Sequence, residues 1–337
     1  MIRRRSLLAL PPLLAAPRPG LAQAGGVPAG GAPPEAQGAY PDHPVAMLVG
    51  FAPGGGTDIT ARLVAPLLSE AFGQAVAVDN RPGGTGTIAA TMLSRARPDG
   101  YTMMMGTVGS NTVLPMLLNP PPFDPLRDIT NVVLAAWVPQ VVTVPASSPA
   151  RSFGEFVALL KARPGQLNYG SSGVASSQHM ATVALLRATG TSMVHVPYRG
   201  SGQAVSDLIA GAIDLNIDTL PTVLPYIRQG VLRGLAVTTP RRVDWLPDLP
   251  TVAESGVPGY EAAVRYMVMG PAGLPQPIVA RWVTAVNRAL EAPGVRERMF
   301  TAGLGVGGGS AAEADAIVRS EAERYGRIVR EANIRIE

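Results

Sequence analysis

The chain has 337 residues, 47% of them hydrophobic, and a formal net charge of +4. It contains no cysteine, which excludes disulfides, thiolate nucleophiles and cysteine-based metal sites, and its three histidines lack the spacing of metal ligands on one helix. Four arginines and no acidic residue lie in the first 24 residues, so the rest of the chain is close to neutral. We therefore expect no metal and no nucleic acid partner.

The first 24 residues have the pattern of an export signal. The segment "MIRRR" is cationic, "SLLALPPLLAAP" is apolar, and "AQA" at 22–24 is a small-residue cleavage site. The apolar segment is too short to span a bilayer, and Arg4-Arg5-Ser6-Leu7-Leu8 is similar to a twin-arginine signal. A disordered, arginine-rich N-terminus is the alternative. Residues 25–40 are rich in Gly, Pro and Ala and are typical of a flexible linker. We therefore expect an exported protein whose ordered part begins near Tyr40.

Strands and helices alternate in the first part of the chain. The apolar run 45–51 predicts a strand, and Ile59, Leu63, Val64, Leu67 and Leu68 share one helical face after it. Pro66 lies inside that pattern and is expected to kink the helix or to restrict it to a short N-terminal piece. Strands are predicted at 74–80 and 101–107, with a helix around 87–96 between them. This alternation predicts an α/β fold with a mostly parallel sheet.

A second series of the same kind follows. Ser310 and Glu313 form a capping box that opens a last helix running to about Asn333. Two such series predict two lobes with a cleft between them, lined by the glycine-rich loops at the strand ends. Helices are predicted at 152–165, 176–190, 202–211 and 277–290, and strands at 166–172, 193–198, 212–218 and 232–239.

The segment "APGGGTDITAR" (52–62) places three glycines before a helix. Bare backbone at a helix start lets several N–H groups converge on a carboxylate, phosphate or sulfate. A nucleotide-binding P-loop would have a lysine after the glycines, whereas Thr57 and Asp58 follow Gly56. A plain turn remains the alternative for this motif alone.

A second glycine segment, "NRPGGTGTIAA" (80–90), matches a dinucleotide fingerprint only loosely, through Gly84, Gly86 and Ala89. Arg81-Pro82 interrupts the step from strand to glycines, and no acidic residue follows at the distance needed to bind a ribose. We therefore expect no nicotinamide, and no other cofactor.

The segment "YGSSGVASSQHM" (169–180) repeats the arrangement of strand, small residues and helix start. Its serines can donate hydroxyls beside main-chain N–H groups. A serine-dependent hydrolase using Ser171 or Ser172 with His179 is the alternative function, although the spacing is not that of a nucleophile elbow. A third glycine loop follows Tyr198 and Arg199, and Arg199 could pair with a ligand carboxylate or be a solvated surface residue. Donors without a nucleophile, a base or a metal favour binding over catalysis.

Several segments together resemble the tripartite tricarboxylate transporter substrate-binding proteins, also called Bug receptors. These are "VGFAPGGGTDITAR", "VDNRPGGTGTIAA", "PDGYTMMMG", "LNYGSSGVASSQHM", "VPYRGSGQAVSDLIAG", "LRGLAVTTPRRVDWLPDLPTVAESGVPGYE" and "GPAGLP", in consistent order from about Pro44 to the C-terminus.

The resemblance implies a two-lobed type II periplasmic-binding-protein fold that closes on a small carboxylated solute and delivers it to a membrane permease. It implies no enzymatic activity, and we expect a monomer. It also implies a first lobe of residues 41–141 and 260–337 and a second lobe of residues 142–259. An effector domain of a regulator shares this fold but would lack an export signal. The implied ligand-binding residues are Phe51, Pro53, Gly54, Gly55, Thr57, Asp58, Ser171, Ser172, Gly173, Ser176, Ser177, His179, Tyr198, Asp218 and Thr219.

The chain departs from the family pattern at three places. Ala175 stands where the family usually has glycine, the crossing at 265–275 lacks the usual Trp-x-Gly segment, and Pro66 is unusual in the first helix. None of these changes removes a donor, so binding of a carboxylate is still expected, and the sequence does not indicate how they affect the choice of solute.

Overall fold

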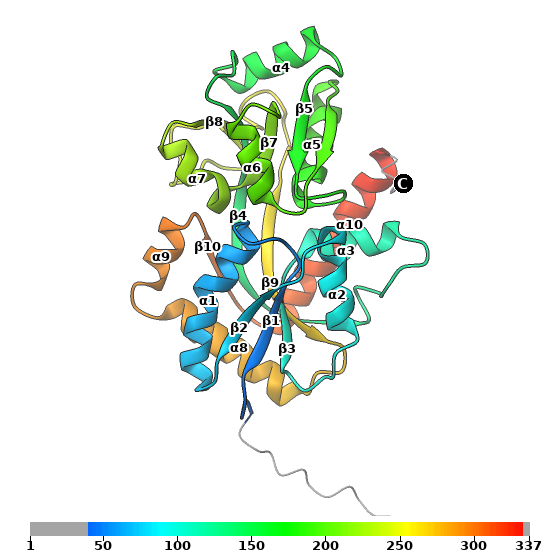
Figure 1. The fold of residues 1–337 in the computed structure, drawn as a ribbon, viewed down its shortest axis with the longest axis vertical. Coiled ribbons are helices and arrows are strands. Elements are labelled where there is room, and N and C mark those ends of the chain that lie inside the picture. The colour runs from blue at the N-terminus through cyan, green and yellow to red at the C-terminus, as the bar shows by residue number, and fades with distance from the viewer. Residues whose placement is uncertain (1–39, 333–337) are drawn as a thin grey trace, which may run out of the picture. The chain divides into compact units, whose positions relative to one another are not determined.

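The computed structural model describes residues 40–332. Its strands are shown in Figure 1 and belong to one connected sheet. They are β1 (Val45–Val49), β2 (Val76–Asn80), β3 (Thr102–Thr107), β4 (Ile129–Pro145), β5 (Asn168–Ser171), β6 (Val194–Pro197), β7 (Leu215–Thr219), β8 (Leu232–Val237), β9 (Ala263–Pro271) and β10 (Gly305–Gly308).

The strand order is β2-β1-β3-β9-β4-β7-β5-β6, and β8 and β10 pair with β4 outside this path. The outer groups, β2-β1-β3 and β7-β5-β6, are parallel, as the sequence predicts. The central strands β4 and β9 are antiparallel to their neighbours, which the sequence did not indicate. Each parallel group is the centre of one lobe, and we call the lobe of β1–β3 the first and that of β5–β7 the second.

The strand β4 extends from the first lobe into the second (Figure 1). Its residues 129–139 pair with β9, whereas residues 140–145 pair with β7 or β8. The predicted strands therefore meet in one sheet that two lobes share. The lobe boundaries given above stay a prediction, and residues 40–332 belong to one compact unit.

The helices cover both faces of this sheet. The capping box of the last helix is confirmed, because Glu313 N donates to Ser310 Oγ at 3.2 Å and Ser310 N donates to Glu313 Oε2 at 2.7 Å. The helices are α1 (Gly56–Phe72), α2 (Thr87–Ser94), α3 (Val108–Leu117), α4 (Phe153–Ala162), α5 (Ser177–Thr189), α6 (Ser201–Ile209), α7 (Leu220–Arg228), α8 (Gln276–Glu291), α9 (Val295–Thr301) and α10 (Ala311–Ala332), with a short 3₁₀ turn η1 (Gly84–Gly86).

Pro66 does not restrict the first helix to a short N-terminal piece, because α1 runs for 17 residues from Gly56 to Phe72 and includes it. A kink at Pro66 stays a prediction. Pro66 is exposed, so water can solvate the carbonyl of Arg62 that the proline ring leaves without an intrahelical donor. The buried face of α1 also differs from the predicted one. Val64 and Leu68 are buried as predicted, but Ile59 is only partly buried.

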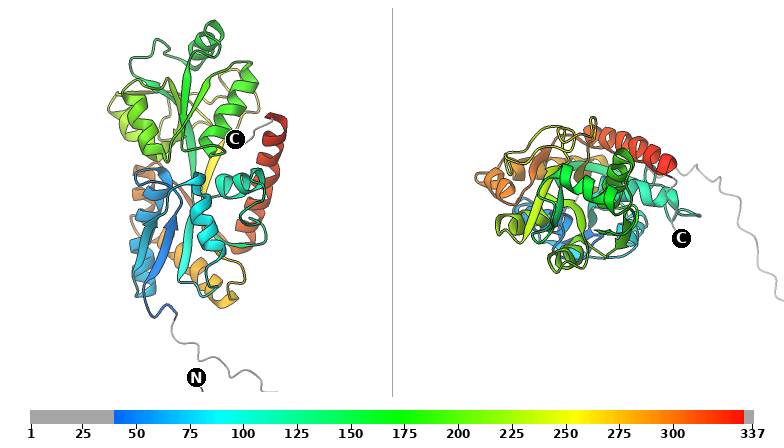
Figure 2. Two further views of the ribbon diagram at one scale, coloured as in Figure 1. Left: turned by 45° about the vertical axis from the view of Figure 1, so that its right-hand side comes forward. Right: turned by 90° about the horizontal axis from the view of Figure 1, so that it is seen from above.

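Each lobe has its own apolar core. In the first lobe Trp282 of α8 is fully buried against α1 and the sheet. In the second lobe Phe156 of α4 belongs to the same buried cluster as Leu215 and Ile217 of β7. A further cluster joins α3 and α10 to α5 through Leu114, Tyr325 and Met180. Figure 2 shows α10 lying beside α3 along one side. The lobes are therefore in contact at their flank as well as through the sheet.

Some predictions lie outside the described residues. The export signal at 1–24, the linker at 25–40 apart from Tyr40, and the end of the last helix at Asn333 belong to this group. Within residues 40–332, none of the helices has the length and apolarity needed to cross a membrane.

Candidate ligand-binding site

Three helix N-termini meet where the lobes touch. They belong to α1 in the first lobe and to α6 and α7 in the second, and none has a side-chain cap. A Cβ placed on Gly55 would lie 3.7 Å from Ser201 Cβ, in the first residue of α6. A Cβ on Gly56 would collide with the hydroxyls of Tyr266 and Thr219. Only glycine fits at Gly56, and the uncapped first turn of α1 is held directly against the second lobe.

Asp58 holds its own loop together. Its carboxylate accepts hydrogen bonds from Gly54 N at 3.0 Å, Arg62 Nε at 2.9 Å and Asn80 Nδ2 at 2.9 Å. Burial opposes ionisation, but these donors outweigh it and keep the pKa of Asp58 below its usual value. Asn80 also donates to the carbonyl of Phe51, so the segment from Phe51 to Asp58 is tied to the end of β2.

The other predicted residues of this first loop differ in exposure. Phe51 and Thr57 are buried, whereas Pro53 and Gly54 are exposed. The Pro53 carbonyl lies 3.5 Å from the Cβ position of Gly202 in α6. The first loop therefore faces the start of α6.

The serines of the second loop are engaged within that loop. Ser176 caps α5 by accepting from His179 N at 3.2 Å, and Ser172 donates to Gln178 Oε1 at 2.8 Å. Ser177 donates to the same amide oxygen at 3.2 Å, and Ser171 Oγ lies 3.0 Å from the Gly173 carbonyl. These hydroxyls fix the shape of the loop.

Two histidines stack behind this loop. The rings of His179 and His195 lie 4.2 Å apart, and His195 stacks on Tyr169 at 4.8 Å. Burial lowers the pKa of His179 to about 3, aided by the neighbouring His195, and lowers the pKa of His195 to about 4. Both imidazoles are therefore neutral at physiological pH.

The serine–histidine pairing of the hydrolase alternative was wrong. Ser171 Oγ lies 2.6 Å from Nε2 of His195, while His179 Nδ1 accepts from Ala175 N at 3.0 Å. Ser171 is fully buried, so a substrate has no approach to its hydroxyl. The geometry gives no support to a hydrolase.

A buried carboxyl group links the helix starts of the second lobe. Asp218 is fully buried and accepts from Thr219 N at 2.7 Å, Gln178 Nε2 at 3.2 Å and Asn216 Nδ2 at 2.9 Å. Burial raises its pKa although these donors act in the opposite direction. Gln178 also donates to Ser201 Oγ at 2.9 Å, so one amide connects the starts of α5, α6 and α7.

Tyr198 turns its hydroxyl away from the helix starts. That hydroxyl donates to Asp207 Oδ2 at 2.6 Å, and burial, with this acidic neighbour, raises the pKa of Tyr198 to about 12. Its ring lies 3.4 Å from the Cβ position of Gly170. Tyr198 can supply a ring face to the site, but its hydroxyl is engaged elsewhere.

The sequence did not indicate four polar residues of the first lobe. Tyr266 of β9 directs its hydroxyl to Gly56, and Thr107, Ser110 and Asn111 are buried at the start of α3. Thr107 Oγ1, Ser110 Oγ and Asn111 Oδ1 have no hydrogen-bond partner among the described residues. The sequence analysis did not predict helix α3. Had it done so, these polar groups would have been recognised at the start of a helix in the first lobe.

The lobes also touch at the loop before α2. Thr85 Oγ1 donates to the Val174 carbonyl at 2.9 Å, and a Cβ on Gly173 would collide with the Thr85 hydroxyl. Thr85 and Ala175 both have positive φ, 52° and 60°, which costs energy in a residue other than glycine. A cavity of about 440 Å³ opens beside this contact, between Ile88, Leu114 and Leu118 of the first lobe and Val174, Tyr198 and Arg199 of the second.

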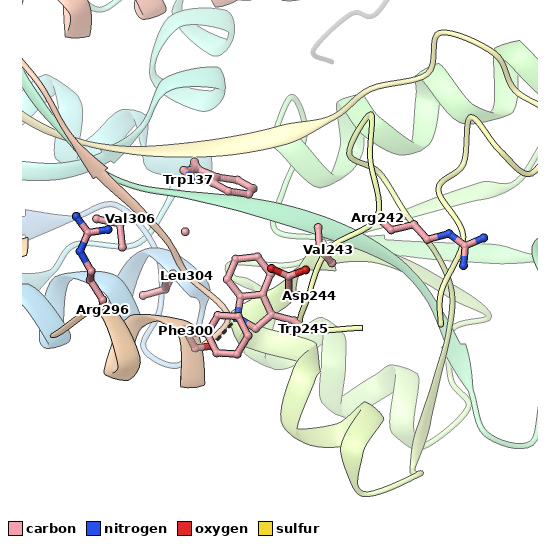
Figure 3. A pocket seen from close by; sticks show the side chains of 10 residues that line it. Trp137, Arg242, Val243, Asp244, Trp245, Arg296, Phe300, Leu304 and Val306 are labelled. Atoms are coloured by element: carbon pink, nitrogen blue, oxygen red, sulfur yellow. Dashed lines mark hydrogen bonds between the residues drawn. The ribbon is translucent and has the colours of Figure 1, made fainter. Parts of the chain in front are cut away.

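A second cavity, of about 540 Å³, contains none of the predicted ligand-binding residues (Figure 3). Trp245 lies in it between Trp137 and Phe300, with ring centroids 6.0 Å and 5.1 Å away, and donates to the Phe300 carbonyl at 2.6 Å. The side chains of Arg242 and Arg296 point away from these rings in Figure 3. The cavity shares no residue with the helix starts described above.

In the described part of the chain, no group of three His, Asp or Glu residues could hold a metal ion.

The comparisons with known proteins agree with this geometry. A model of the tripartite tricarboxylate transporter family receptor matches residues 60–334. The chain belongs to this family. It is 32% identical to protein BugT of Bordetella pertussis over 310 residues, 92% of this chain and 95% of BugT.

Solved structures of relatives have the same fold. Rpa4515 of R. palustris with adipate is 37% identical and superposes with a TM-score of 0.85 over 88% of this chain and 99% of that chain. MatC of Rhodopseudomonas palustris with bound malate is 29% identical, with a TM-score of 0.82 over 86% of this chain and 100% of that chain. The family resemblance and the two-lobed α/β fold are therefore confirmed. Members of the family are periplasmic solute-binding receptors and not enzymes.

Proposed function

We propose that the chain is a periplasmic receptor that captures a small carboxylate-bearing organic anion between its lobes and delivers it to a tripartite tricarboxylate-type permease. The main support is the meeting of the uncapped N-termini of α1, α6 and α7. Free N–H groups and the positive end of the helix dipole at such positions stabilise an anion. The buried polar and charged residues among those described include no lysine or arginine, so the main chain and hydroxyls are the available donors.

The bound relatives support the chemical class of the solute. Rpa4515 was solved with adipate and MatC with malate, both small carboxylates. In this chain the main-chain N–H groups of Gly55, Gly56 and Thr57 hold the carboxylate, and Ser201 and Thr219 close over it from the second lobe. The loop of residues 171–179 forms the neighbouring wall.

Export and assembly complete the proposal. Residues 1–24 direct export, with Arg4 and Arg5 giving the signal its twin-arginine form. The receptor acts as a monomer whose lobes, residues 41–141 with 260–337 and residues 142–259, close about their two crossings.

A pair of substitutions at Gly55 tests this proposal. The three heavy atoms nearest to a Cβ at this position all belong to Ser201, so valine should hold the lobes apart without disturbing α1. Alanine should fit, because the 3.7 Å separation is ordinary contact. Calorimetric titration with adipate, malate and the neutral adipamide should show binding of at least one carboxylate but not of the diamide. Gly55→Val should weaken that binding at least tenfold, and Gly55→Ala by less than threefold.

Two results would contradict the proposal. One is equal binding of adipate and adipamide, because the site would then not select for charge. The other is unchanged affinity in a folded Gly55→Val protein, because the ligand would then bind away from the start of α1.

A further inference from the structure

Helix α3 changes character along its length. At its start Thr107, Ser110 and Asn111 are 4%, 1% and 5% exposed, and each has a polar side-chain atom with no partner among the described residues. A buried polar atom without a partner costs free energy, so polar groups gathered in this way indicate a polar group bound beside them. The start of α3 is therefore suited to hold part of a ligand.

The later part of α3 is apolar. Leu114 follows Ser110 by four residues and lies on the same side of the helix, and Leu118 is the residue at which α3 ends. Both leucines line the cavity of about 440 Å³, a size typical of small-molecule sites. Ile88 faces the same cavity and is 51% exposed, so an apolar group in the cavity would cover it.

The polar start of α3 adjoins the first turn of α1. Thr107 pairs with Tyr266 across β3 and β9, and the Tyr266 hydroxyl abuts Gly56. Asn111 Oδ1 lies 3.5 Å from the Cβ position of Gly86, and the Phe51 ring lies 3.6 Å from that same position. A ligand held at the start of α1 therefore has polar contacts from α3 beside it and the apolar cavity further along α3.

We propose that α3 selects carboxylates with an apolar body: the acid group lies at the starts of α1 and α3, and an alkyl or aryl group extends along Leu114 and Leu118 into the cavity beside Ile88. This inference rests on the proposed function and adds the solute class to it. The exposed Arg199 at the rim of the cavity contributes its aliphatic stem to the apolar wall.

A series of monocarboxylates tests the proposal. Calorimetric titration of the purified protein with butyrate, pentanoate, hexanoate and 3-phenylpropionate should show affinity rising about fourfold for each added methylene, the equivalent of ~0.8 kcal/mol per buried CH₂. Ile88→Ser and Leu118→Ser should each weaken hexanoate by about threefold or more and leave butyrate nearly unchanged. Met92→Ser is the matched control, because Met92 is 42% exposed on the same helix as Ile88 and does not line the cavity.

The outcomes separate the two proposals. If adipate, malate and all the monocarboxylates fail to bind, the proposed function fails. If adipate or malate binds but affinity does not rise with chain length, the selection along α3 is overturned and the receptor function stands. The same holds if Met92→Ser weakens hexanoate as much as Ile88→Ser does.

Discussion

The hydroxyl of Thr85 in the first lobe donates a 2.9 Å hydrogen bond to the main-chain carbonyl of Val174 in the second. The two residues are 89 positions apart, and the bond joins loops that each contain a non-glycine residue with positive φ. Such a contact forms only while the lobes are together. It therefore contributes to the closed state that holds the ligand.

Removing this hydroxyl should weaken ligand binding. A neutral hydrogen bond contributes about 0.5–1.5 kcal/mol, so Thr85→Ala should raise the dissociation constant about two- to tenfold. Thr85→Ser keeps the donor and should retain most of the affinity. Calorimetric titration of both variants with the tightest-binding carboxylate measures the difference, and equal losses in the two would show that the hydroxyl is not responsible.

The stacked histidines should make the protein sensitive to acid. Unfolded histidine has a pKa near 6.5, whereas burial lowers the pKa of His179 to about 3 and of His195 to about 4. Between these values the unfolded chain binds more protons than the folded one, so stability falls as the pH drops from about 6.5 towards 4. Urea unfolding at pH 7, 6 and 5 should show a midpoint that decreases steadily.

Substitution of His179 provides the control for this effect. Asparagine at that position can still accept the hydrogen bond from Ala175 N, which His179 Nδ1 accepts at 3.0 Å, but it does not titrate. His179→Asn should therefore lose less stability than the wild type between pH 7 and pH 5. An unchanged pH dependence would mean that other groups cause the acid sensitivity.

Pro66 should reduce the stability of α1 without serving the site. It lies on the exposed side of the helix and removes one intrahelical hydrogen bond. Pro66→Ala should raise the free energy of unfolding by about 1–3 kcal/mol. Thermal unfolding measures this, and ligand affinity should not change because Pro66 is more than two turns beyond the loop that ends at Gly55. A lower melting temperature would show that the proline is required for the packing of α1.

Trp245 should report closure by its fluorescence. It lies in the second lobe's segment after β8 and stacks on Phe300 of α9 in the first lobe, with its Nε1 donating to the Phe300 carbonyl (Figure 3). Ligand that brings the lobes together should move its emission to shorter wavelength. Trp245→Phe should abolish the shift, whereas Trp282, fully buried in the core of the first lobe, should contribute constant emission. A shift that persists in Trp245→Phe would place the response at Trp137.

Much of the fold was predictable because strands and glycine loops leave strong local patterns. The runs that became β1 and β3 are largely apolar, and β7 alternates apolar and polar residues, and the structure has all three close to the predicted places. Helices α3 and α7 were missed because Gly109 and Pro115 in the first, and Pro225 in the second, are typical of loops. Both are stabilised by burial against other elements, which no local pattern reports.

The sequence predicted the loops of the site but not the residues that lie against those loops in the fold. The first loop lies at the start of α1 as predicted, yet its neighbour across the lobes is Ser201, far away in the sequence. The serines of the second loop are typical of ligand donors, but Ser172 and Ser176 are committed to hydrogen bonds within the loop and α5. Tyr266 was missed because it comes from an antiparallel central strand, and only the three-dimensional pairing brings it beside Gly56.

The shared strand β4 has a mechanical consequence. Its first residues pair with β9 and its last residues with β7 or β8, so unfolding of this one strand removes backbone pairing from the sheets of both lobes. Neither half has an independent boundary at which it could fray while the other persists. The receptor should therefore denature as one cooperative unit.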